Sequence, residues 1–404
     1  MLKKNDTIQF ILIILMLIGL FSSRALLSVT SVGVLLFFLN GKKDKKTLQI
    51  TVTASLLLIA PVVSSFFFST DKQQWWRVVA EKMPLLSLGL GFSYLDISLK
   101  RYKQLSWFLS AFVFIGTIYT STYYVTHFHQ VNEAYLQASV LPTLLDSNHI
   151  HFSWLVVLTI LLILKIQSHA SDSERKVSLA LIIWFIFFLH LLAAKTGLIL
   201  LYLVFFILLI SFFKRNPKKI ISFLVIAFFI IAAALTFIPT FQNRIKFIRW
   251  DLENYSTGNF LPGLSDGNRW LSIKAGYFVF QQHPLTGTGF GDIKKDTDQF
   301  IQSTQPQIPV EERFLPLNQW IIYAAGSGII GILFFTAGII LFLLLLIKTK
   351  NIFSNLTALV LIGPLFIDDT LETQFGIFIF IFFIFWMRYS FISGHKDKQL
   401  NDGK

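Results

Sequence analysis

Residues 177–213 decide the fold of this chain, and they read VSLALIIWFIFFLHLLAAKTGLILLYLVFFILLISFF. Lys195 is the only Lys, Arg, Asp or Glu among them. Because a transmembrane helix needs about 20 mostly apolar residues, the stretch is long enough for two membrane spans, 177–193 and 196–213. We expect two apolar helices with almost no turn between them and the Lys195 ammonium at their shared end.

The composition of the whole chain also indicates a membrane protein. Of its 404 residues, 54% are hydrophobic and 14% are charged, and the mean hydropathy is +0.65. A soluble protein carries about 25% charged residues, so a soluble globular fold is excluded. The chain has no cysteine, which excludes disulfides, thiolate metal sites and cysteine nucleophiles.

The apolar segments predict an all-α polytopic membrane protein with twelve spans. The predicted spans are 8–22, 26–40, 48–69, 83–98, 104–126, 151–166, 177–193, 196–213, 220–239, 322–347, 352–367 and 374–390. They divide the chain into nine spans within 1–239, a large loop with helices over 240–319, three spans within 320–390, and a tail over 391–404.

The charged residues indicate the orientation of these spans. The side that holds both termini carries 22 Lys and Arg with 7 Asp and Glu, whereas the other side carries 13 with 15. The net charges are therefore +15 and −2, and cytoplasmic loops are the ones enriched in Lys and Arg. We expect cytoplasmic termini, an outward-facing loop over 240–319, and no nucleic-acid partner, since topology explains the net charge of +13.

Two cations on the outer side are the first candidates for a functional site. Lys195 either binds an anionic headgroup or a substrate phosphate, or it snorkels to the membrane interface. Arg269 lies in the first turn of a predicted helix that Asp266 or Asn268 caps and that ends before Pro284. The helix dipole does not stabilise a cation there, which favours a specific partner for Arg269.

Other polar residues have both structural and functional interpretations. Arg244 begins a basic and aromatic segment that suits an interfacial helix against anionic lipid. Asn318, followed by Gln319, is a natural N-cap for the tenth span. Glu311 and Glu312 are either a general base or solvated loop carboxylates. No histidine spacing matches a metal site, so no metal is expected.

Glycines occur at alternate positions in one part of the predicted outer loop, at Gly287, Gly289 and Gly291. A nucleotide-binding loop of this kind follows a strand and precedes a helix, whereas here a predicted helix precedes it. The glycines therefore indicate a tight loop with positive φ that packs on the membrane domain.

Taken together, these features resemble the O-antigen ligase and O-antigen polymerase superfamily. The resemblance rests on the twelve spans, the large outer loop before the tenth span, and Arg269 followed by a helix. It also rests on two spaced motifs, Pro284-x-Thr-Gly-x-Gly-x-Gly291 and Asn318-x(7)-Gly-x-Gly-x-x-Gly331. The specific matches are confined to about 190–200 and 265–331.

The resemblance implies a glycosyltransferase of the bacterial inner membrane that acts on the periplasmic face. Such an enzyme takes a glycan from an undecaprenyl-diphosphate carrier, without a metal or another cofactor. Ligases pass the glycan to lipid A–core, and polymerases pass it to another lipid-linked repeat. In this chain Lys195 and Arg269 would clamp the diphosphate and Asn318 would orient donor or acceptor. The predicted substrate-binding residues are Arg244, His283, Glu311, Glu312 and Gln319.

The chain departs from the family pattern at two positions. Family ligases commonly have Arg where Lys195 stands, and Lys lacks the bidentate fork of the guanidinium. They also carry a His directly before the Asn, whereas this chain has Leu317, which accepts no proton. The base is then Glu311, Glu312, His283 or Asp369, or the chain catalyses a different reaction, or it is inactive.

Two rival functions stay open on the sequence alone. A transporter or lipid flippase places ionisable residues near the middle of the bilayer, but these spans hold almost no charge at that depth. A non-catalytic assembly protein is compatible with Leu317. Because the polar residues collect on the outer side, an outward-facing glycosyltransferase is the preferred interpretation.

Overall fold

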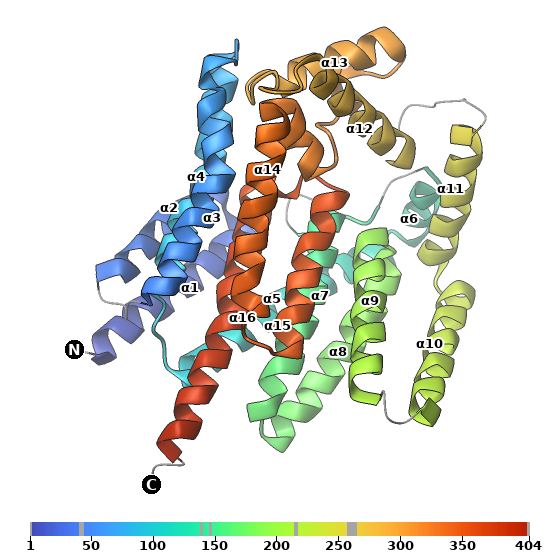
Figure 1. Cartoon of the computed structure of the whole chain (residues 1–404). Helices are drawn as coiled ribbons and strands as arrows, with labels where there is room; N and C mark the ends of the chain where they lie inside the picture. Colours follow the sequence, from blue (N-terminus) through green and yellow to red (C-terminus); the bar gives the residue numbers. More distant parts are fainter. Residues whose placement is uncertain are drawn as a thin grey trace. The chain divides into compact units, whose positions relative to one another are not determined.

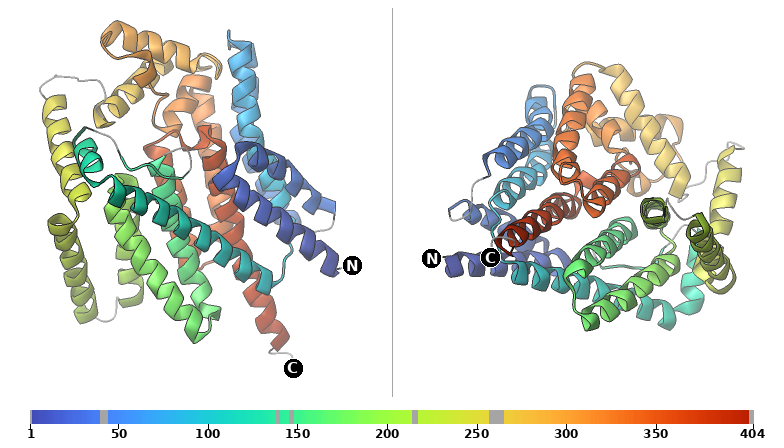
Figure 2. Two further views of the ribbon diagram at one scale, coloured as in Figure 1. Left: turned by 180° about the vertical axis from the view of Figure 1, so that it is seen from behind. Right: turned by 60° about the horizontal axis from the view of Figure 1, so that its bottom comes forward.

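The computed structural model describes residues 2–39, 44–137, 140–144, 148–213, 217–256 and 265–401. Every regular element within these ranges is a helix (Figures 1 and 2), which confirms the predicted all-helical fold. The contacts divide the chain into two compact units. Unit 1 comprises Met1–Leu109 with Asn268–Lys404, and unit 2 comprises Ser110–Gly267.

Unit 1 is built around the long helix α14. Helices α3 and α14 lie side by side, and α16 contacts both α4 and α14 (Figure 1). The helices of this unit are α1 (Leu2–Ser22), α2 (Arg24–Gly33), α3 (Lys45–Ser64), α4 (Lys72–Phe92), most of α12 (Ser265–Gln282), α13 (Ile293–Thr304), α14 (Gln319–Ile347), α15 (Ile352–Ile362) and α16 (Gln374–Asn401).

Unit 2 is built around α7, which contacts α8 and α9. Nearly every residue of α7 is buried, as expected for a helix that is hydrophobic on all sides. Helix α10 is the opposite case, because Phe228, Phe229 and Phe237 are exposed. The helices of this unit are most of α5 (Leu99–Thr126), α6 (Phe128–Ala134), α7 (His149–Ile166), α8 (Asp172–Leu192), α9 (Lys195–Phe213), α10 (Pro217–Phe237) and α11 (Pro239–Ser256).

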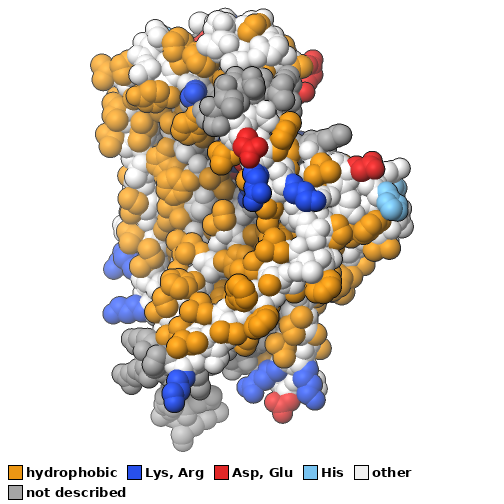
Figure 3. All heavy atoms as spheres, turned by 90° about the vertical axis from the view of Figure 1, so that its right-hand side faces the viewer, with side chains coloured by type: hydrophobic (Ala, Val, Ile, Leu, Met, Phe, Trp, Pro, Cys, Tyr) orange, Lys and Arg blue, Asp and Glu red, His pale blue; other side chains and the backbone are white. Residues whose placement is uncertain are grey.

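Seven described helices are long and apolar enough to cross a membrane, and hydrophobic side chains cover much of the face in Figure 3. They are Lys45–Phe67, Leu99–Thr126, His149–Ile166, Asp172–Leu192, Lys195–Phe212, Ile220–Phe237 and Gln319–Ile347. Shorter apolar helices cover Asp6–Ser22, Arg24–Phe37, Ile352–Phe366 and Gln374–Arg388. The chain is thus a membrane protein, while the number of crossings stays a prediction.

Two predicted boundaries differ from the structure. The predicted span 83–98 falls on α4, which begins at Lys72 and ends at Phe92. Asp71 starts this helix early because its carboxylate accepts a hydrogen bond from the Gln74 amide at 2.8 Å. Near the other end of the chain, α16 continues to Asn401, so residues 391–401 of the predicted tail are helical.

The predicted glycine loop is confirmed, and it packs against a break in α14. Gly287 and Gly289 have φ values of 68° and 97°, and α14 is non-helical at Ser327 and Gly328. The Thr288 amide donates to Ala325 O at 2.8 Å and the Gly289 amide to Gly326 O at 3.1 Å. Because backbone groups in an apolar surrounding need internal partners, the loop stabilises the broken helix.

We expect Gly287→Ala to lower the melting temperature of the protein. A left-handed conformation costs a residue with a Cβ about 1–2 kcal/mol, and the added Cβ would also collide with the backbone of Ser327. Gly33→Ala is the matched control, since its Cβ would meet only the Leu12 side chain at 3.4 Å. Thermal unfolding in detergent measures both variants, and an equal shift in the two would contradict the packing argument.

Residues 240–319, predicted as a loop with helices, contain α11, α12 and α13. Within unit 1, Asp292 fastens the start of α13 to the hairpin between α3 and α4. Its buried carboxylate accepts hydrogen bonds from the Thr70 amide, from Thr70 Oγ1 at 2.7 Å and from the Asp71 amide at 3.1 Å. These hydrogen bonds fix the start of α13 within unit 1.

Candidate functional site

Lys195 is the first residue of α9 and follows the end of α8 almost directly. Ala193 adopts a left-handed conformation with φ 49°, which reverses the chain without a longer loop. The sequence prediction of two apolar helices with almost no turn is therefore confirmed. Because a helix N-terminus carries positive partial charge and free amide groups, Lys195 adds its charge where an anion is already favoured.

The charges of three further side chains of unit 2 act on Lys195. Its ammonium forms an ion pair with the Asp266 carboxylate, and the Asp266 amide donates to Asp251 Oδ2 at 3.1 Å. The charges of Arg244 and Asp251 also act on the Lys195 ammonium. We call these four residues the Lys195 cluster.

Burial distinguishes the members of the Lys195 cluster. Asp251 is fully buried and Arg244 is 5% exposed, whereas the Asp266 side chain is 48% exposed. Burial raises the pKa of Asp251, which its hydrogen bond with the Asp266 amide opposes. An exposed ion pair stabilises a protein by only about 0–1 kcal/mol, so an incoming anion can displace Asp266 from Lys195 at small cost. Asp251 stays in place beside the cations.

Arg269 belongs to unit 1 and faces an acidic turn, residues 368–372, between α15 and α16. Its positive charge acts on the carboxylates of Asp368 and Asp369. One helical turn further, Ser272 Oγ donates to Arg269 O at 2.8 Å and accepts from the Leu317 amide at 3.1 Å. These two hydrogen bonds join the segment before α14 to the part of α12 that carries Arg269. Helix α12 begins at Ser265, earlier than the predicted caps at Asp266 or Asn268.

Asn318 caps α14, as the sequence predicted. Its Oδ1 accepts hydrogen bonds from the amides of Trp320 at 3.0 Å and Ile321 at 3.2 Å. Its Nδ2 donates to Phe366 O at 2.9 Å. Both ends of the amide thus bond within the protein, which favours a role in positioning the acidic turn over direct contact with substrate.

Gln319 and a buried ion pair hold the acidic turn from the other side. The fully buried Gln319 accepts from the Leu371 amide at 2.9 Å and donates to Glu372 Oε1 at 2.6 Å. Lys82 Nζ, on α4, lies 2.6 Å from both Glu372 Oε1 and Leu371 O. The side chains of Lys82 and Glu372 are 0% and 7% exposed. No local sequence pattern predicts this pair, because 290 residues separate its partners.

We expect Lys82→Ala to destabilise the protein by about 3–5 kcal/mol, because it leaves a buried carboxylate without its cation. Replacing both partners, with Lys82→Met and Glu372→Leu, should recover most of the lost stability. Denaturant or thermal unfolding of the three proteins measures the effect. The stabilising role of the pair would be contradicted if Lys82→Ala were as stable as the native chain, or if the double variant were no more stable than Lys82→Ala.

The two aspartates of the acidic turn titrate above their ordinary range. Burial raises the pKa of Asp368, the adjacent Asp369 raises it further, and Arg269 lowers it. Burial also raises the pKa of Asp369, with Glu372 acting in the same direction and Lys82 and Arg269 opposing it. The neighbouring carboxyls therefore titrate as a pair. A carboxylate with a raised pKa is a better proton acceptor than an ordinary one.

The other predicted site residues differ in exposure and, within the described part of the chain, form no side-chain bond to Arg269. His283 is exposed and follows Arg269 by 14 residues on the same helix and its end, which is about 21 Å at 1.5 Å per residue. Glu311 is exposed and Glu312 half-buried in the short helix Val310–Glu312. Among the described residues, no hydrogen bond or ion pair joins these three side chains to Arg269. No group of three or more His, Asp or Glu there suits a metal ion.

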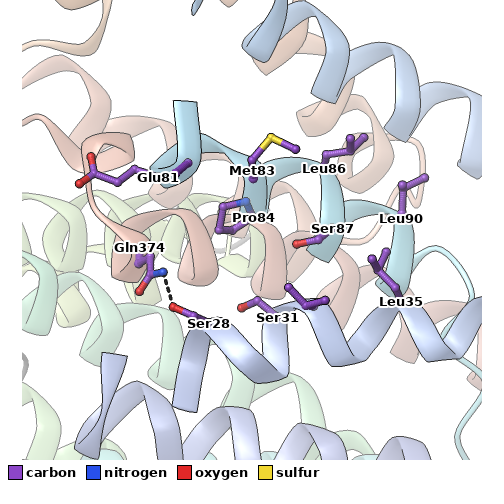
Figure 4. A pocket seen from close by; sticks show the side chains of 12 residues that line it. Ser28, Ser31, Leu35, Glu81, Met83, Pro84, Leu86, Ser87, Leu90 and Gln374 are labelled. Carbon is purple, nitrogen blue, oxygen red and sulfur yellow. Dashed lines mark hydrogen bonds between the residues drawn. The ribbon is translucent and has the colours of Figure 1, made fainter. Parts of the chain in front are cut away.

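A cavity of about 500 Å³ in unit 1 lies between α2 and α4 (Figure 4). Apolar side chains such as Met83 and Leu90 form most of its lining, and Gln374 donates to Ser28 Oγ at 2.6 Å at one end. Glu81 is the charged residue of its lining, and no Lys or Arg contributes to it. A diphosphate needs cations, so this cavity does not fit one.

Comparison with protein families gives a match over part of the chain. The O-antigen ligase family model covers residues 179–336, and no curated protein matches the chain. The matched range contains the Lys195 cluster, Arg269, Asn318 and Gln319, while Lys82 and the acidic turn lie outside it. Residues 179–336 are thus similar to the O-antigen ligase family, which supports the resemblance found in the sequence.

Proposed function

We propose that this protein transfers a glycan from a polyprenyl-diphosphate carrier, undecaprenyl diphosphate in bacteria, to an acceptor hydroxyl. The transfer takes place on the periplasmic face of the inner membrane, with both termini in the cytoplasm. Lipid A–core is the first candidate acceptor, and a growing polysaccharide is the second. The family match over 179–336 and the charge asymmetry of the sequence support this proposal.

The observation that carries the proposal is the Lys195 cluster at the N-terminus of α9. When the bond between the sugar and the diphosphate breaks, negative charge develops on the leaving oxygen. Cations and amide groups that already point at this position stabilise that charge without reorganisation. Lys195 and Arg244 supply the cations, and the charge of the buried Asp251 acts on both of them. Arg269 keeps the diphosphate-binding role predicted from the sequence.

We assign the general base to Asp369. Its carboxylate takes the proton of the acceptor hydroxyl as that oxygen attacks the anomeric carbon, and the diphosphate leaves with the electrons of the broken bond. The charge of Arg269 acts on the Asp369 carboxylate, and burial raises the pKa of this group. It is half-buried, whereas its neighbour Asp368 is 4% exposed, so Asp369 is easier for an acceptor to reach. Asp369 would thereby take the role of the family histidine, whose position Leu317 occupies in this chain.

Purified protein in nanodiscs, given a lipid-linked glycan donor, tests the proposal. Separate reactions contain lipid A–core or a second lipid-linked repeat, and free polyprenyl diphosphate and glycosylated acceptor are measured. Release of the carrier together with transfer to either acceptor supports the proposal and identifies the reaction. Movement of the donor across a liposome membrane without any transfer product would instead indicate a flippase.

A further inference from the structure

A second cavity, of about 390 Å³, lies between α12 and α13 in unit 1. This volume is within the range of about 300–1,000 Å³ that small-molecule sites occupy. Its lining includes Phe278, Phe300, Gln282, His283, Gln299 and Asp296. Of these six residues, only His283 was singled out by the sequence, as a substrate-binding candidate.

The lining combines two aromatic rings, one exposed and one half-buried, with planar polar groups. Phe278 is 40% exposed, and its ring lies 4.8 Å from that of Phe300, centroid to centroid. Gln282 and Gln299 are exposed, and each amide offers both a donor and an acceptor. A pyranose has an apolar face of C–H groups and a rim of hydroxyls. The rings suit that face and the amides suit that rim.

Other ligand classes fit this lining less well. Among the described residues of the lining there is no Lys or Arg, and Asp296 brings a negative charge, which disfavours phosphates and other anions. A hydrocarbon chain would leave the amides, the imidazole and the carboxylate without polar partners, at a cost for each group. A neutral polyhydroxylated ligand satisfies both the rings and the polar groups.

The walls of the cavity are held in place by the glycine loop. Helix α12 ends at Gln282, and the His283 amide still donates to Val279 O and Phe280 O. The Thr288 hydroxyl, in the loop, donates to the Asp296 carboxylate on α13. The Thr288 amide in turn bonds to Ala325 O of α14. The cavity is therefore formed before a ligand arrives, which reduces the entropy lost on binding.

We propose that this cavity binds a saccharide residue of the glycan, several residues away from the bond that reacts. The proposal rests on the proposed function and names where that function holds its polymeric substrate. His283 follows Arg269 by about 21 Å of helix, at 1.5 Å per residue, so a single sugar at the reacting end cannot also occupy the cavity. The site distinguishes long glycans from short ones.

Binding of a soluble oligosaccharide tests the proposal without catalysis. The probe is the delipidated repeat oligosaccharide that mild acid releases from the host strain's surface polysaccharide, added to the full-length protein in nanodiscs. Saturation-transfer NMR and titration calorimetry detect it. The double variant Gln282→Ala with Gln299→Ala should bind at least about tenfold more weakly, since two hydrogen-bonding groups are lost. Gln281→Ala is the matched control, because this exposed glutamine of α12 lies outside the cavity.

The outcomes separate this proposal from the proposed function. The saccharide site is supported if only the double variant binds the oligosaccharide more weakly. The KM of this variant should also rise for long-glycan donors and stay unchanged for a single-repeat donor. Absence of binding to the native protein, or equal loss in Gln281→Ala, overturns it even if transfer proceeds normally. If the protein binds the oligosaccharide specifically but transfers no glycan to any acceptor, the saccharide site is supported and the proposed transferase function is rejected.

Discussion

Lys195→Ala is expected to lower the rate of glycan transfer by about 10²–10³-fold, with unchanged expression and folding. The reason is electrostatic, because removing one preorganised contact to a developing charge commonly has an effect of this size. Lys195 is 28% exposed and bonds to the exposed carboxylate of Asp266, and the buried Asp251 keeps Arg244 as a cation that acts on it when Lys195 is lost. The single-turnover rate with lipid-linked donor measures the effect.

Three further variants make this experiment specific. Lys246→Ala removes an exposed cation of α11 outside the Lys195 cluster and should leave the rate unchanged. Lys195→Arg should retain activity, because it keeps the charge and adds a bidentate donor. Asp266→Asn removes the carboxylate that competes with the diphosphate and should lower the KM for the donor. Equal rates in Lys195→Ala and the native protein would eliminate the cluster as the diphosphate site.

The sequence predicted those parts of the structure that local patterns determine. The turn before Lys195, the cap at Asn318 and the positive φ values at Gly287 and Gly289 each depend on residues within one helix end or one loop. Apolar periodicity likewise located the long helices. The early start of α4 was missed because its first turns are polar, although the signal, Asp71 as an N-cap, is present in the sequence.

The missing parts of the site depend on contacts that no local pattern encodes. In the sequence, Lys82 is a charged residue beside a predicted span. Only the packing of α4 against the acidic turn pairs it with Glu372. Asp251 reads as one polar residue of an interfacial helix, and only folding buries it beside the cations. Buried charges require partners, but the identity of those partners is a property of the tertiary structure.

Asp369→Asn is expected to reduce transfer by about 10²–10⁴-fold, the usual contribution of a positioned general base. The amide keeps the size of the side chain and removes its ability to accept a proton, so donor binding should change little. A fall in kcat with an unchanged KM is therefore the expected result. Glu311→Gln serves as the matched control, since this exposed carboxylate is not tied to Arg269, and it should leave kcat unaltered.

The pH dependence of the reaction gives an independent test of the same assignment. A base acts only when deprotonated, and burial raises the pKa of Asp369 above that of an ordinary aspartate, which is about 4. As pH falls, the rate should therefore decline at a higher pH than an exposed carboxylate would produce. Arg269 lowers the pKa values of Asp368 and Asp369, so in the residual activity of Arg269→Ala this decline should move to still higher pH. If Asp369→Asn retains both its rate and the acid limb of the profile, the proton goes to another group and the acidic turn has a structural role alone.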